Sequence, residues 1–115
     1  MSQITEIKKL QEDIKYLVSH INNTHKHEKP ELISYMKVIE EVGEITEVLL
    51  SNQIKSRKHE KLSKEYIKKP LGDEIADCII ALLSLANDFD IPIEESIDKK
   101  MKKHYQRNID SNKTY

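Results

Sequence analysis

The sequence has few of the residues that make turns, strands and disulfides. Its 115 residues include two glycines, three prolines, one cysteine and no tryptophan, whereas 34% are charged. Scarce glycine and proline beside plentiful Ile, Leu, Lys and Glu are typical of long helices, so we expect an all-α protein. The lone Cys78 lies in the apolar run "DCIIALLSLA" with no basic neighbour, which predicts a small buried thiol rather than a nucleophile.

Long apolar runs and a cationic excess are also missing. No segment approaches the roughly 20 apolar residues that cross a bilayer, and the N-terminus has no apolar signal-peptide core. We therefore expect a cytoplasmic protein without a membrane partner. The formal net charge of −1 argues against broad nucleic-acid binding, which normally requires a basic surface that replaces counterions.

Apolar residues recur every three or four positions, which predicts helices. The length favours one domain, residues 1–115, built as a four-helix bundle type. The predicted helices cover about 4–21, 31–54, 72–89 and 93–107, with a basic, partly helical linker at about 51–69 and a frayed tail at about 108–115.

The helices at about 31–54 and 93–107 each carry an apolar seam, as does the helix at about 4–21, and the helix at 72–89 is apolar almost all round. The helix at 72–89 should therefore be central in the bundle. The seam residues expected to point inward are Leu32, Met36, Ile39, Val42, Ile45 and Leu49 in the second helix, and Ile93, Ile97, Met101 and Tyr105 in the fourth.

Acidic residues form two similar motifs, each beside a strongly apolar run. Glu41 and Glu44 are three residues apart in "EEVGE", and Glu74 and Asp77 are three apart in "DEIAD". At about 100° per residue each pair faces one side of its helix. If the two helices pack antiparallel, four carboxylates can gather at one place.

Gathered carboxylates repel one another unless a cation lies between them. Oxygen ligands favour Mg²⁺, or Mn²⁺, over zinc. A single such motif is more often a solvated helix face, so the metal-site interpretation depends on the two motifs occurring together.

The two motifs and their apolar surroundings resemble the MazG-like family of all-α nucleoside triphosphate pyrophosphohydrolases, whose signature is EExxE, a spacer, then ExxD. The resemblance runs from about Glu31 to Arg107. It implies that Glu41, Glu44, Glu74 and Asp77 hold Mg²⁺, that Glu41 or Glu44 also activates water, and that Glu40 and Asp73 have supporting roles.

The resemblance also implies a phosphate-binding last helix and a homodimer or homotetramer. Lys100 and Arg107 match the family's basic frame, with His104 where asparagine is expected, and Lys103 is a further phosphate candidate. Relatives often stack an aromatic residue, commonly tryptophan, on the base. This chain could use Tyr16, His20 or Tyr35, although tyrosines on a helical seam are more often packing residues.

The resemblance therefore implies a Mg²⁺-dependent enzyme that cleaves a (deoxy)nucleoside triphosphate into the monophosphate and pyrophosphate, in nucleotide-pool housecleaning. Two alternatives remain open at this point. One is a non-catalytic helical interaction or regulatory module whose acids and bases form ion pairs between subunits. The other is a hydrolase of a different phosphorylated metabolite, such as an alarmone.

Overall fold

The computed structural model describes residues 6–22, 30–59 and 64–110, with side chains described for 6–20, 30–51 and 66–109. The described residues are almost entirely helical, which confirms the all-α class and the four helices. The elements are α1 (Ile7–Asn22), α2 (Pro30–His59), α3 (Lys64–Asp88), α4 (Ile93–Tyr105) and a π-helical turn, η1 (Gln106–Asp110).

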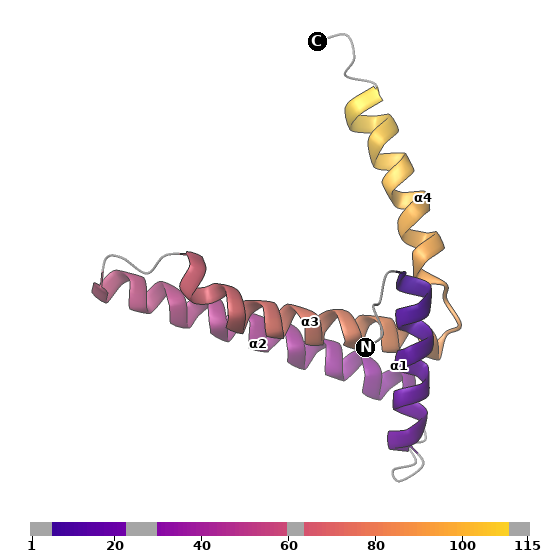
Figure 1. The fold of residues 1–115 in the computed structure, drawn as a ribbon, viewed down its shortest axis with the longest axis horizontal. Helices are drawn as coiled ribbons and strands as arrows, with labels where there is room; N and C mark the ends of the chain where they lie inside the picture. The colour runs from indigo at the N-terminus through magenta and orange to yellow at the C-terminus, as the bar shows by residue number, and fades with distance from the viewer. Residues whose placement is uncertain (1–5, 23–29, 60–63, 111–115) are drawn as a thin grey trace.

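The two longest helices, α2 and α3, form an antiparallel hairpin (Figure 1). The predicted linker at 51–69 is largely part of this hairpin, because α2 continues to His59 and α3 begins at Lys64. Pro70 therefore lies inside α3, although the sequence predicts that the helix begins near it. Packing along α2 can offset the penalty that local propensity assigns to proline and glycine in a helix.

The hairpin buries a different side of α2 from the one predicted. Val38 and Glu41 of α2 are buried, whereas Leu32, Met36, Ile39, Val42 and Leu49 of the predicted seam are exposed and Ile45 is half-buried. The prediction of an inward seam is thus wrong for the single chain. The helix has apolar residues on more than one side, and periodicity alone does not say which side its own chain covers.

The buried apolar core of the described residues is small. Its members are Ile14 of α1, Val38 of α2, and Cys78, Ala81, Leu83 and Ala86 of α3. The buried, unpaired thiol of Cys78 agrees with the sequence prediction. Because α3 contacts both α1 and α2, it is the central helix, as expected.

A buried polar junction attaches α1 to the turn between α3 and α4. The Gln11 amide nitrogen donates to Asn87 Oδ1 at 3.1 Å and to the Ile91 carbonyl at 2.9 Å. Gln11 Oε1 accepts from the Ile93 backbone N–H at 3.0 Å, so a side chain of α1 caps the start of α4. In the turn, Asp90 has a left-handed backbone conformation with φ of 54°.

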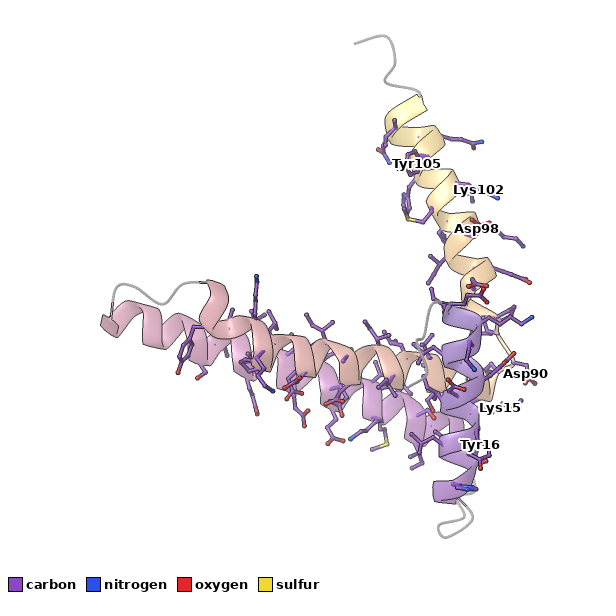
Figure 2. The ribbon with its side chains drawn as sticks, in the orientation of Figure 1. Lys15, Tyr16, Asp90, Asp98, Lys102 and Tyr105 are labelled. Carbon is purple, nitrogen blue, oxygen red and sulfur yellow. The ribbon has the colours of Figure 1, made fainter. Side chains whose placement is uncertain are left out.

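Helix α4 projects away from the hairpin (Figures 1 and 2) and has no buried residue. Ile97, Met101 and Tyr105, predicted to face inward, are exposed. The turn η1 continues α4 through residues 108–110 of the predicted tail, and residues 111–115 lie outside the described part of the chain. None of the described helices is both long and apolar enough to span a bilayer.

Candidate functional site

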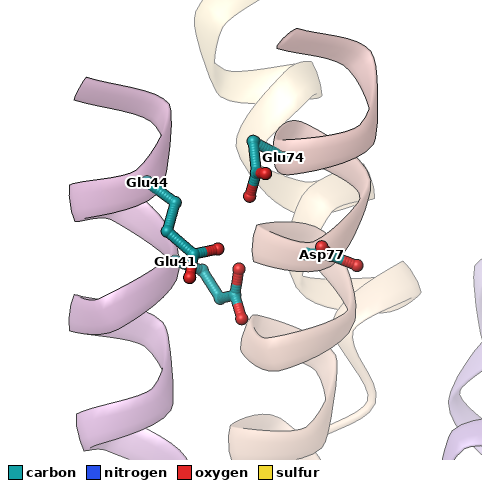
Figure 3. Close-up of side chains that lie close together, drawn as sticks. All are labelled: Glu41, Glu44, Glu74 and Asp77. Carbon is teal, nitrogen blue, oxygen red and sulfur yellow. The ribbon is translucent and has the colours of Figure 1, made fainter. Parts of the chain in front are cut away.

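Four carboxylates meet between α2 and α3 (Figure 3). Their positions in the sequence place them about midway along the hairpin. Glu41 and Glu44 project from successive turns of α2, and Glu74 and Asp77 project from successive turns of α3. One oxygen of each side chain lies within 4.8 Å of the others. The antiparallel packing of two helices with the same three-residue spacing brings these four predicted ligands together.

The acidic cluster, defined as Glu41, Glu44, Glu74 and Asp77, is closed on one side and open on the other. Glu41 is only 4% exposed, Glu44 and Glu74 are half-buried, and Asp77 is exposed. The carboxylate oxygens Glu41 Oε2 and Glu74 Oε2 are buried and have no hydrogen-bond partner. Buried carboxylate oxygens without partners are unfavourable, and a cation between them would satisfy both.

Electrostatic interactions within the cluster move two pKa values in opposite directions. The ammonium group of Lys37, hydrogen-bonded to Glu41, holds the pKa of Glu41 below its ordinary value. Hydrogen bonding of the Glu44 carboxyl, first to Glu74 and then to Glu41, raises the pKa of Glu44 to about 7. Without a metal, Glu44 therefore reduces the repulsion from Glu41 and Glu74 by holding a proton.

A divalent metal ion would replace this proton. The donor set consists of four carboxylates, the ligand type that hard divalent cations prefer. The exposed side beside Asp77 leaves room for water or substrate oxygens in the coordination shell. The residues present therefore fit a divalent cation.

The two predicted supporting acids lie outside the acidic cluster. Glu40 is exposed and lies 3.5 Å from Lys37 Nζ. Asp73 is exposed and pairs with Lys69 at 3.3 Å. Each belongs to an ion pair on the surface of its own helix, of a kind that usually contributes little to stability.

A cavity of about 370 Å³ adjoins the acidic cluster. Glu41 and Asp77 belong to both, so the cavity opens onto the prospective metal position. Its walls are mainly aliphatic and come from three helices, and they include Leu17 and Val18 of α1, Ile33 of α2, and Ile80 and Ala81 of α3. Its volume lies in the range of small-molecule binding sites.

The aromatic residues predicted for base binding do not line this cavity. Tyr16 and His20 are exposed on α1 and pack against each other, with ring centroids 4.8 Å apart. Tyr35 is exposed on α2. Their role in base binding therefore stays a prediction.

The predicted phosphate-binding residues lie on the projecting part of the chain. Lys100 and Lys103 are on α4 and Arg107 is in η1, and all three are exposed. Figure 1 shows this part of the chain extending away from the hairpin that carries the acidic cluster. A single chain therefore does not bring the four acids and these three bases together.

The comparison with known families adds to this geometry. The sequence model of the MazG-like family matches residues 37–115, which include both acidic motifs and α4. The chain belongs to the MazG-like family. No curated protein and no solved structure matches this MazG-like chain significantly.

Sequence reasoning missed two features of this MazG-like site. Lys37 is four residues before Glu41, a spacing that places the two side chains side by side on a helix, and this signal was available. The contribution of Leu17 and Val18 to the cavity had no such signal. Both have the spacing of ordinary packing residues, and only the crossing of α1 over the hairpin turns them toward the site.

Proposed function

We propose that this MazG-like protein is a Mg²⁺-dependent nucleoside triphosphate pyrophosphohydrolase with a role in nucleotide-pool housecleaning. The observation that carries the proposal is the acidic cluster, in which four carboxylates from both signature motifs meet and two buried oxygens have no partner. Family membership supplies the reaction class, and the adjoining cavity supplies a place for the nucleoside.

Mg²⁺ is the proposed cation, with Mn²⁺ as a substitute, and Glu41, Glu44, Glu74 and Asp77 would hold it. Carboxylates combined with water and phosphate oxygens are the usual surroundings of Mg²⁺ in phosphate chemistry. When bound, the metal would lower the pKa of a water molecule and offset the negative charge of the phosphates.

In the proposed reaction the oxygen of a water molecule forms a bond to the α-phosphorus. The bond from this phosphorus to the oxygen that bridges to the β-phosphate breaks, and pyrophosphate leaves with the bridging oxygen. Glu41 or Glu44 orients the water and accepts its proton, and the remaining acids hold the metal. The nucleoside lies between the aliphatic walls of the cavity, while the phosphates lie over the acidic cluster.

A second copy of the chain would complete the site, in a homodimer or a homotetramer. Four apolar residues follow one another every four positions along α4 and η1, and all are exposed: Ile97, Met101, Tyr105 and Ile109. The same part of the chain carries the predicted phosphate ligands, which complement the charge of the acidic cluster. Packing of this stripe on the exposed seam of α2 in another copy would cover both apolar surfaces and bring bases to acids.

The deciding experiment measures pyrophosphate and nucleoside monophosphate release from a panel of ribo- and deoxyribonucleoside triphosphates with Mg²⁺. An alarmone is included to test the alternative substrate class. We expect turnover of at least one triphosphate, abolished by EDTA and restored by Mg²⁺. Absence of turnover with every triphosphate would reject the enzyme and favour an interaction module, whereas turnover of the alarmone alone would change the substrate class.

The ligand assignment is tested with variants of the active protein. Glu44→Gln and Asp77→Asn each keep the size of the side chain and remove a charged ligand, and we expect at least a hundredfold loss of turnover with helicity unchanged by circular dichroism. Glu47→Gln is the matched control, because Glu47 is an exposed acid of the same helix outside the acidic cluster. Equal activity of Glu44→Gln and Glu47→Gln would contradict the assignment.

A further inference from the structure

Lys37 lies where the acidic cluster meets the cavity. Its Nζ is 3.0 Å from Glu41 Oε1 and 3.5 Å from Glu40 Oε1. Its side chain is 54% exposed, whereas that of Glu41 is 5% exposed, so the ammonium group joins a buried ligand oxygen to solvent. Lys37 also lines the cavity, and it is the one basic residue among the described residues that do so.

The charge of the site favours a cation at this position. The acidic cluster carries more negative charge than one divalent ion cancels, and a triphosphate adds more. Asp77 and Glu41, at the same end of the cavity as Lys37, would repel phosphate oxygens. Lys37 offsets this repulsion from within the same chain, whereas the basic residues of α4 lie on a helix that projects away.

The ammonium group also has unused hydrogen-bonding capacity. Lysine has three N–H donors on a flexible four-carbon stem. Contacts with Glu41 and Glu40 occupy two of them at most, and the exposed side of the ammonium group faces solvent. A donor therefore remains for an oxygen of a molecule that lies in the cavity mouth.

The proposed function fixes which oxygen this would be. With the nucleoside between the aliphatic walls and the phosphates over the acids, the group that crosses the junction is the α-phosphate, because it alone is attached to the nucleoside. We propose that Lys37 is a catalytic residue of this chain whose Nζ donates to a non-bridging oxygen of the α-phosphate. This inference rests on the proposed function, and it adds a phosphate-binding residue in the helix of the first acidic motif.

The test compares Lys37→Met, which keeps an unbranched side chain one atom shorter and removes its charge, with Lys69→Met. Lys69 is the matched control because it also pairs with an acid four residues away, Asp73, but lies outside both the cavity and the acidic cluster. With saturating Mg²⁺ and the best triphosphate of the panel, we expect kcat/KM to fall at least a hundredfold in Lys37→Met and less than threefold in Lys69→Met. Lys37→Arg should recover part of the loss.

Binding measurements distinguish two roles of Lys37: direct contact with phosphate, and positioning of the metal ligand Glu41. Mn²⁺ affinity, measured by calorimetry, should change less than threefold in Lys37→Met. Affinity for AMP, CMP, GMP and UMP in the presence of Mn²⁺ should fall at least tenfold for each monophosphate that the wild type binds, with no change for the matching nucleoside. If Lys37→Met loses helicity, Lys37→Gln, which keeps a donor to Glu41, takes its place.

Two outcomes would overturn the inference. The first is an active wild type whose kcat/KM is unchanged by loss of the Lys37 charge. The second is a loss of Mn²⁺ affinity as large as the loss of monophosphate affinity, which would make Lys37 a support of the metal ligand. A wild type without turnover rejects the proposed function instead, and the monophosphate measurements still decide whether Lys37 contacts phosphate.

Discussion

Replacing Gln11 with alanine should destabilise the protein by about 3 kcal/mol. The side chain is buried, with 8% of the residue exposed, and makes three hydrogen bonds with Asn87, Ile91 and Ile93. Each such bond contributes about 1 kcal/mol net, and the groups left behind are part-buried. For a domain of this size the loss corresponds to a fall in Tm of roughly 12 °C.

The assay is thermal and urea unfolding at one fixed protein concentration, because assembly would make Tm depend on concentration. Glu12→Ala is the control, since Glu12 is the exposed next residue of α1. Hydrogen exchange adds a local measurement: the Ile93 amide, which Gln11 caps, should exchange faster in Gln11→Ala. A loss below about 1 kcal/mol, or unchanged exchange at Ile93, would refute the assignment of this junction as the support of α4.

Three further predictions concern the acidic cluster and α3. At a Mg²⁺ concentration a hundred times the dissociation constant, the free energy of unfolding of the wild type should rise by about 2.7 kcal/mol. Glu47→Gln should show the same stabilisation by Mg²⁺, whereas Glu74→Gln should lose it. An undiminished stabilisation of Glu74→Gln by Mg²⁺ would exclude Glu74 as a ligand. In EDTA, the raised pKa of Glu44 makes a contribution to stability that is full below pH 4.5 and is lost as the pH rises through about 7. The Tm of the wild type relative to Glu44→Gln should therefore fall from pH 5 to 8 in EDTA; a flat difference would contradict the shift. Gly72→Ala should stabilise the protein by about 1 kcal/mol, because alanine has a higher helix propensity than glycine and the added Cβ meets no atom within 4 Å. Urea unfolding measures this change, and a destabilised Gly72→Ala would contradict the prediction.

The acidic cluster was predictable because its causes are local and repeated. The spacing of Glu41 and Glu44 puts both on one side of α2, and the same spacing of Glu74 and Asp77 does so on α3. One further assumption, antiparallel packing of consecutive helices, brings the pairs together. The helix count followed from the same periodicity.

Other features depend on contacts between distant residues, and the sequence does not encode them locally. Gln11 and Ile93 are 82 positions apart, yet their hydrogen bond fixes the start of α4. The continuation of α3 through Pro70 was not predicted either, because proline is normally unfavourable inside a helix. The exposed seam of α2 includes Met36 and Ile39, and its sequence pattern is the same as that of a buried seam. Periodicity shows that one side of a helix is apolar, but it does not show whether the same chain or another chain covers that side.

The position of the acidic cluster midway along the hairpin divides the two long helices into parts with different tolerance to change. From the cluster to α1 and the cavity, any shift of one helix relative to the other would separate the acids. Beyond the cluster, the ends of α2 and α3 approach a tip that carries none of the four acids. Seven residues added to each arm there, about two helical turns, would keep both faces in phase. We therefore expect that the hairpin can be lengthened or tagged at this end without changing the relative positions of the four acids.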